Sequence, residues 1–167
     1  MPLVKSGATI ADPFTPVADG EVLPDGPVIV SAARLAAEKE SLLARNGEIG
    51  VAWPNDRDVG ELQPLLSRLS LISLSLPKFR DGRAYSQARL LRERYGFKGE
   101  LRATGNVLRD QLLMLARSGF DALVVEKEAD AAAAAQALAS YSLFYQPTGD
   151  GRRTVAEARR APQERPA

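Results

Sequence analysis

Short apolar runs alternate with longer stretches of helical spacing from residue 28 onward. The apolar and β-branched runs predict five strands, over residues 28–30, 49–53, 71–76, 100–104 and 122–125. Strands that alternate with helices of this length are typical of a parallel sheet with right-handed crossovers. We therefore predict an α/β fold of about five β/α units, in which a mainly parallel sheet carries helices on both faces. The alternative is an arc resembling part of a TIM barrel.

Helix signals separate these strands. Ser31 can cap a helix over residues 31–45, and Leu62 to Leu69 form a second apolar face in which Pro64 must lie in the first turn or kink the helix. Asp81 and Asn106 can cap helices over residues 82–95 and 107–118, and an alanine-rich helix is expected over residues 130–141.

The two ends of the chain differ from its middle. Residues 1–27 hold five of the eleven prolines, and Ser6-Gly7 separates two short apolar-polar stretches, so we predict a hairpin arm at the edge of the sheet. Residues 28–147 are predicted to form a single α/β domain. Residues 148–167 carry few large apolar side chains, which predicts a disordered tail.

The amino-acid composition excludes several classes of catalytic and metal site. The 167 residues include no Cys and no His, which excludes His-based triads, the usual zinc sites and Cys-ligated iron–sulfur clusters. No nucleotide-binding signature follows a strand, so no cofactor is predicted, and intrinsic redox activity would need a bound organic cofactor. The net charge of +1 and the lack of a signal or spanning segment predict a cytoplasmic protein without nucleic-acid or membrane partners.

Cationic side chains follow the third predicted strand. Lys78, Arg80 and Arg83 flank Asp81 and Gly82 at a helix start, where free N–H groups favour anions. This pattern predicts a site for a small oxyanion such as sulfite, sulfate, phosphate or a carboxylate. The alternative is a solvated loop whose charges serve solubility and capping.

Arg102 lies within the fourth predicted strand, where a central parallel strand is usually apolar throughout. A buried guanidinium needs an acidic partner, and we expect Asp81, Asp110 or Glu126. Otherwise the strand is an edge, or Arg102 reaches solvent. We expect Lys78, Arg83 and Arg102 to converge on one pocket mouth.

The helices on either side of Arg102 in the sequence supply further candidates. Tyr85 and Ser86 can donate to a ligand oxygen, Arg89 can hold an anion, and Asp110 lies in the first turn of the next helix. Lys78, Asp81 and Tyr85 are the candidate catalytic residues. The predicted ligand-binding residues are Lys78, Asp81, Gly82, Arg83, Ser86, Arg89, Arg102 and Asp110. Tyr85 could equally be a core aromatic, and Asp110 could serve only the helix dipole.

The run over residues 76–123, with its DGRAYS, ARLLRERYG, GELRA and VLRDQL segments, resembles a bacterial family of uncharacterised proteins. That family carries the label "oxidoreductase probably involved in sulfite reduction". The chain departs from the family pattern at Asn106, where the family has Asp, and near Ser118, where it often has Cys. A redox thiol at Ser118 is thus excluded.

The resemblance implies an accessory role in assimilatory sulfate and sulfite reduction, with sulfite reductase as the partner and no redox metal in this chain. Two other classes stay open: a lyase, isomerase or flavin-dependent reductase acting on an anionic metabolite, and a purely structural or interaction module.

Overall fold

The structure is a computed structural model that describes residues 1–160. Its strands are β1 (Leu3–Lys5), β2 (Ala8–Ile10), β3 (Thr15–Pro16), β4 (Val28–Ser31), β5 (Ile49–Trp53), β6 (Leu71–Leu76), β7 (Glu100–Gly105) and β8 (Ala122–Val124). The α-helices are α1 (Ala32–Ala37), α2 (Lys39–Ala44), α3 (Arg83–Arg89), α4 (Leu112–Arg117), α5 (Glu128–Leu138) and α6 (Val155–Arg160). The 3₁₀ segments η1 (Val59–Leu65) and η3 (Arg109–Gln111) and the π-helical segment η2 (Leu90–Arg94) complete the secondary structure.

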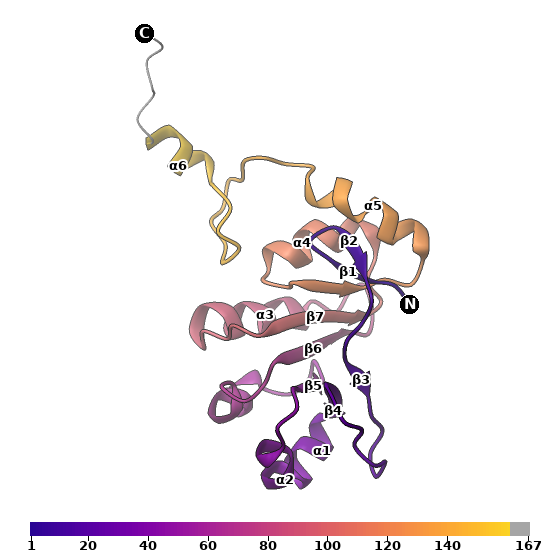
Figure 1. Ribbon diagram of the computed structural model, residues 1–167. Helices are drawn as coiled ribbons and strands as arrows, with labels where there is room; N and C mark the ends of the chain where they lie inside the picture. The colour runs from indigo at the N-terminus through magenta and orange to yellow at the C-terminus, as the bar shows by residue number, and fades with distance from the viewer. Residues whose placement is uncertain (161–167) are drawn as a thin grey trace.

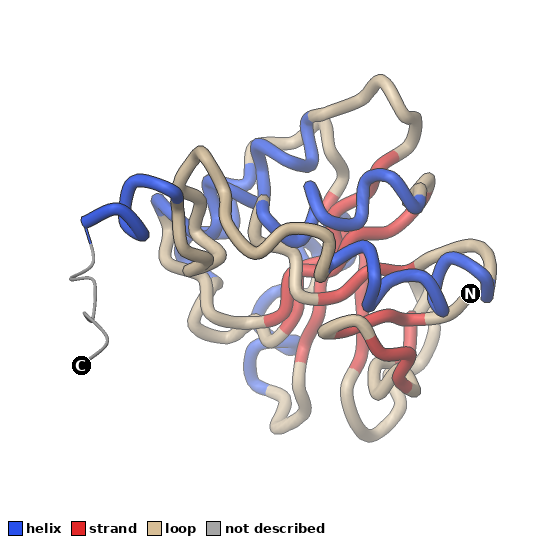
Figure 2. Tube along the Cα trace, turned by 90° about the horizontal axis from the view of Figure 1, so that it is seen from above, coloured by secondary structure: helices blue, strands red, loops and turns tan. Residues whose placement is uncertain are grey.

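All eight strands belong to one sheet in the order β2-β1-β8-β7-β6-β5-β4-β3. The sheet is curled, and its strands are drawn in red in Figure 2. The strands from β3 to β8 are mutually parallel, and β1 is antiparallel to both of its neighbours. The predicted α/β fold with a mainly parallel sheet is confirmed. Its form is the alternative that the sequence left open, an arc resembling part of a barrel.

The helices α1 to α5 cover one face of this sheet, whereas the sequence predicted helices on both faces. The reason is the strand order: β4 to β8 follow one another in the sheet as they do in the chain. Right-handed crossovers that always advance in the same direction place every helix on the same face. We call this face the covered face and the opposite one the inner face.

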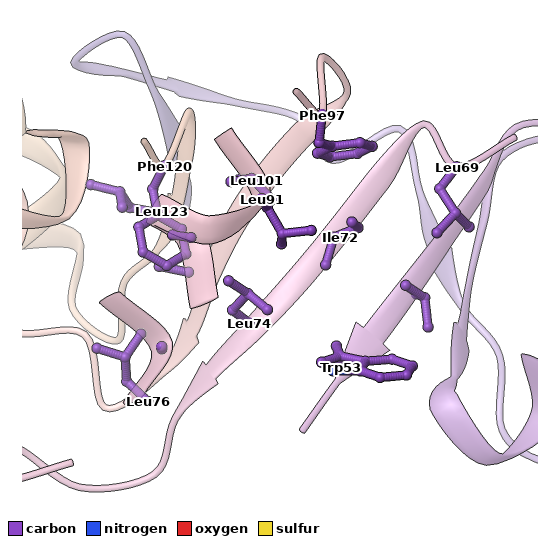
Figure 3. Packing of buried hydrophobic residues seen from close by; sticks show 14 of the residues in the cluster. Trp53, Leu69, Ile72, Leu74, Leu76, Leu91, Phe97, Leu101, Phe120 and Leu123 are labelled. Atoms are coloured by element: carbon purple, nitrogen blue, oxygen red, sulfur yellow. The ribbon is translucent and has the colours of Figure 1, made fainter. Parts of the chain in front are cut away.

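The covered face holds a continuous apolar core (Figure 3). Alternate strand residues such as Ile72, Leu74 and Leu101 pack there against Leu91 and the other helix residues. The core members from the helices are Ala32, Leu35, Leu42, Val59, Leu62, Ala84, Ala88, Leu91, Leu112, Leu115, Ala131 and Ala134. Burial of these side chains is the main stabilisation of the fold.

The inner face is composed differently. Ser73 and Ser75 alternate with the leucines of β6, so the two serines point away from the helices. The register places Ala52 of β5 beside Ser73 and Thr104 of β7 beside Ser75. A second, small cluster of Phe14, Ile29 and Leu71 also lies on this face.

The N-terminal residues form the predicted edge hairpin. Ser6 and Gly7 both have positive φ, of 52° and 81°, as the tight turn between two antiparallel strands requires. Residues 11–14, here called the strap, then lead from β2 at one edge of the sheet to β3 at the other (Figure 1). The strap contacts the inner face, because Asp12 pairs with Arg102 and Phe14 packs against Ile29 and Leu71.

Most predicted helices are present but shorter or locally altered. Ser31 caps α1 as expected, accepting from the Arg34 N–H at 2.9 Å, and the helical stretch is interrupted at Glu38. Pro64 lies inside a 3₁₀ segment rather than an α-helix. Within residues 1–160 the longest α-helix is α5, with eleven residues, and no helix has the length and apolar character to cross a bilayer.

Residues 148–160, predicted to be disordered, make specific contacts in the structure. Arg117 donates to the Gln146 carbonyl at 2.6 Å and pairs with Asp150, and its guanidinium lies 3.8 Å from the Phe144 ring centroid. Thr154 is bridged to Phe144, and α6 follows. Polar anchoring thus holds a segment that has little apolar surface. The remainder of the predicted tail, residues 161–167, lies outside the described residues.

Candidate functional site

A groove between α3 and the η3–α4 segment brings together five of the residues predicted from the sequence. It encloses about 600 Å³ and is lined by Phe79, Gly82, Tyr85, Ser86, Arg89, Asp110, Gln111, Met114 and Ser118. We call it the α3–α4 groove. Among the predicted ligand-binding residues, Gly82, Ser86, Arg89 and Asp110 line it, together with the candidate catalytic residue Tyr85.

Helical spacing explains why these residues meet. Tyr85 and Ser86 each lie three or four residues from Gly82 and from Arg89, and this spacing places the four on one side of α3. The lining residues from the second segment, beginning at Asp110, repeat at a similar spacing. The buried positions of both helices pack against the sheet, so the lining positions are left facing each other at the surface.

The α3–α4 groove contains side chains of both charges. Arg89 pairs with Glu93 at 3.2 Å, and both side chains are exposed. Burial raises the pKa of the Tyr85 hydroxyl, and the negative charge of Asp110 raises it further. Tyr85 therefore stays protonated at neutral pH and can donate a hydrogen bond.

Asp81 and Arg83 pair with each other and do not line an open site. The Asp81 carboxylate accepts from Arg83 Nε at 2.9 Å and Nη2 at 2.7 Å, and from Asn55 Nδ2 at 2.8 Å. The hydrogen bond from Arg83 is the main reason that the pKa of Asp81 lies far below its usual range. Lys78 is exposed in the loop after β6 and makes no ion pair within residues 1–160.

Arg102 does not join Lys78 and Arg83, contrary to the expected convergence. It is buried on the inner face, at 2% exposure, where it pairs with Asp12 at 2.6 Å and Glu100 at 2.9 Å. None of the expected partners, Asp81, Asp110 and Glu126, contacts it. The pairing with Glu100 directs the guanidinium toward the start of β7, whereas Lys78 follows the end of β6.

A second hollow of about 380 Å³ continues the α3–α4 groove along α4. Its lining residues are Asp110, Leu113, Met114, Arg117, Tyr141, Leu143, Phe144 and Tyr145, so the two hollows share Asp110 and Met114. Five exposed large apolar side chains line them: Phe79, Met114, Tyr141, Leu143 and Tyr145. Two more, Leu90 and Leu108, are exposed on the adjoining η2 segment and just before η3. Together they form an extended apolar surface on the α4 side of the molecule.

The sequence prediction missed a third hollow, on the inner face. It encloses about 360 Å³ at the carboxyl ends of β4 to β7 and is lined by Ser31, Ala32, Ala33, Ala52, Trp53, Pro54, Ser73, Ser75 and Thr104. We call it the strand-end hollow. The alternation of Ser and Leu in residues 71–76 was the available signal, because it places two hydroxyls on one face of a strand.

The three candidate catalytic residues do not pair with one another through their side chains. Within the described part of the chain, no hydrogen bond joins the side chains of Lys78, Asp81 and Tyr85 to one another, so these candidate catalytic residues form no nucleophile–base pair. Residues 1–160 also contain no group of three or more carboxylates placed to share a metal ion.

Comparison with known families gives one match. A family model described as "Bacterial protein of unknown function (DUF934)" matches residues 50–156, which include β6 to β8, all but the first residue of β5, and the whole α3–α4 groove. No curated protein and no solved structure matches the chain.

Proposed function

Because the chain belongs to this bacterial family of unknown function, DUF934, and has the groove described above, we propose that it is an accessory protein that docks onto sulfite reductase. The resemblance of residues 76–123 to proteins labelled for sulfite reduction supplies the partner. The α3–α4 groove and the hollow that continues it supply the docking surface.

The observation that carries the proposal is the concentration of exposed apolar side chains. Seven of the ten large hydrophobic residues that are exposed in residues 1–160 surround these two hollows or lie on the adjoining segments. Met114 is 63% exposed and Tyr145 88%. Contiguous apolar surface of this kind is typical of protein–protein interfaces, where aromatic residues and Met are enriched.

Unpaired cations beside the apolar surface indicate that the surface of the partner carries negative charge. Lys78, Arg80, Arg94 and Arg109 are exposed and form no ion pair within the described residues. A complementary surface would present apolar side chains flanked by carboxylates. We propose that this is the face of sulfite reductase that the chain recognises.

A docking role also suits the amino-acid composition. Electron transfer to sulfite needs a redox centre, and the chain has neither Cys nor His to ligate a metal cluster or a haem in the usual way. The structure does not bring Lys78, Arg83 and Arg102 together, so the proposal places recognition in the groove and not in an oxyanion cradle.

The test is co-purification of the chain with sulfite reductase, comparing the wild type with Met114→Asp. A carboxylate at an exposed, central position of the apolar surface should weaken the complex at least tenfold, because it must be desolvated on docking. Val22→Asp is the matched control, since Val22 is 92% exposed and lies in the loop between β3 and β4, outside the groove.

Deletion of the chain should slow growth on sulfate as the sole sulfur source, and Met114→Asp should reproduce that defect while Val22→Asp should not. Absence of co-purification together with normal growth after deletion would overturn the proposal. Lys78→Ala separates docking from catalysis, since a docking protein would lose affinity only, and weakened docking should also follow from raised salt.

A further inference from the structure

The α3–α4 groove contains hydrogen-bonding groups that the protein itself does not use. Gln111 lines the groove at 8% exposure, and its Oε1 accepts from the Leu108 N–H at 3.1 Å. This contact fixes the orientation of the side-chain amide, because only the oxygen can accept a hydrogen bond. The Nε2 group of Gln111 makes no hydrogen bond within residues 1–160 and keeps contact with the open groove. Two N–H donors on a buried side chain are thus left for a ligand.

Tyr85 and Asp110 add one donor and one acceptor to this amide. The Tyr85 hydroxyl and the Asp110 carboxylate line the groove, and neither makes a hydrogen bond or an ion pair within the described residues. The negative charge of Asp110 raises the pKa of Tyr85, which indicates that the carboxylate and the hydroxyl lie close to each other. Asp110 also directly precedes Gln111 in the chain. Donors and an acceptor therefore meet in one part of the groove.

A peptide backbone is complementary to this set of groups. It offers C=O acceptors for Gln111 and Tyr85 and an N–H donor for Asp110, because every residue except proline carries both groups. The apolar lining from Phe79 and Met114 suits a side chain carried by such a backbone. A ligand with a carboxylate at this place would be repelled by the charge of Asp110. The lining therefore favours a neutral peptide unit.

The unused groups also indicate the form of the partner segment. In a helix or inside a sheet, backbone N–H and C=O groups bond to one another, so they are not free to bond to the groove. An extended loop or chain end keeps these groups free. The hollow along α4 shares Asp110 and Met114 with the groove and so continues it, with Tyr141 and Tyr145 in its lining. The two hollows together offer a track for several consecutive residues.

We propose that the α3–α4 groove binds an extended peptide segment of sulfite reductase, in which one backbone carbonyl accepts from Gln111 Nε2 and one backbone N–H donates to Asp110. An apolar side chain of the segment packs against Phe79 and Met114. Acidic residues on either side of it face the unpaired cations beside the groove. This inference rests on the proposed docking and narrows it from a surface of the partner to a single segment.

The test measures the binding of labelled synthetic peptides that overlap and together span the sulfite reductase chain. Fluorescence anisotropy titrations with the full-length protein should identify one segment that binds saturably. The same peptide without a label should displace intact sulfite reductase from the protein. The segment should be apolar with acidic flanks, so its binding should weaken as the salt concentration is raised.

Gln111→Glu separates recognition from folding. A Glu carboxylate still accepts from the Leu108 N–H, but it replaces the free donors with an acceptor that repels a carbonyl oxygen. We expect peptide binding to weaken at least about tenfold, without a loss of thermal stability relative to the control. The control is Gln63→Glu, the same change at an exposed position of η1 outside both hollows, which should leave binding unchanged. Tyr85→Phe should weaken binding about fivefold through loss of a single hydrogen bond.

The outcomes distinguish this inference from the docking itself. If intact sulfite reductase binds but no peptide does, the inference is overturned while the docking stands. The same conclusion follows if the peptide binds to folded Gln111→Glu and Tyr85→Phe as tightly as to the wild type. If neither the enzyme nor any peptide binds, both proposals are overturned.

Discussion

The covered and inner faces of the sheet are built from alternate residues of the same strands, yet they are stabilised in different ways. On the covered face, leucines, valines and isoleucines pack against helices in one apolar core. On the inner face, hydroxyls, alanines and a buried arginine paired with two carboxylates take their place, and the strap contacts part of the surface. The covered face therefore determines the stability of the fold, and the inner face is free to vary in chemistry.

The largest difference should appear for Leu74→Ala. Leu74 is a residue of β6 whose side chain is fully buried against the helices. Truncating it removes apolar contacts and leaves a cavity. We expect the free energy of unfolding to fall by about 3 kcal/mol, measured by urea denaturation. A loss below about 1 kcal/mol would show that the covered face is not the main stabilising layer.

Arg102→Met removes both ion pairs that Arg102 makes on the inner face. The change leaves Glu100, at 12% exposure, with Lys5 as its one remaining cationic partner, and releases Asp12 from the strap contact. Because Glu100 keeps Lys5 and Asp12 is partly exposed, the loss should stay below the roughly 3–5 kcal/mol typical of a broken buried pair, and we expect about 2 kcal/mol in the same assay. Addition of Asp12→Asn should cost less in this background than in the wild type, because the two residues are coupled.

Ser73→Ala is the matched counterpart of the leucine substitution, one residue away on the other face. Ser73 is buried, but among residues 1–160 its hydroxyl bonds only to Thr104. We expect a loss of about 0.5–1 kcal/mol, since Thr104 can still bond to the Leu74 carbonyl. A cost equal to that of Leu74→Ala would remove the distinction between the faces.

The smallest effect concerns Tyr85, which packs against the outer layer of the covered core and lines the α3–α4 groove. Burial and Asp110 raise its pKa above 10.0, so the unfolded chain loses the Tyr85 proton first as pH increases. Its contribution to stability is complete below about pH 10 and is lost as pH rises through the folded-state value. Ultraviolet titration of tyrosinate should show that Asp110→Asn lowers this pKa slightly, because burial, the larger cause, remains.

The individual elements could be predicted from the sequence because their signals are local. The run of residues 71–76 marks β6, Ser31 marks the start of α1, and Ser6-Gly7 marks the hairpin turn. Gly82, Tyr85, Ser86 and Arg89 were each predicted as site candidates from their residue types, and the structure places all four in one groove. Such patterns depend on neighbours within one turn of helix or along one strand.

Long-range pairings could not be predicted in this way. Arg102 finds Asp12, ninety residues earlier in the chain, because the strap passes over β7, and no spacing rule connects the two. The position of the helices depends on strand order, which local periodicity does not encode. Arg117 binds the segment around Asp150 through polar contacts, which a scan for apolar residues overlooks.

The four residues of the strap also limit the shape of the whole sheet. If the sheet were flat, its outermost strands β2 and β3 would be separated by about 34 Å, seven spacings of about 4.8 Å. The chain from the end of β2 to the start of β3 can span no more than about 17 Å. The covalent length of this connection thus holds the two edges together, and a longer connection would allow the arc to open.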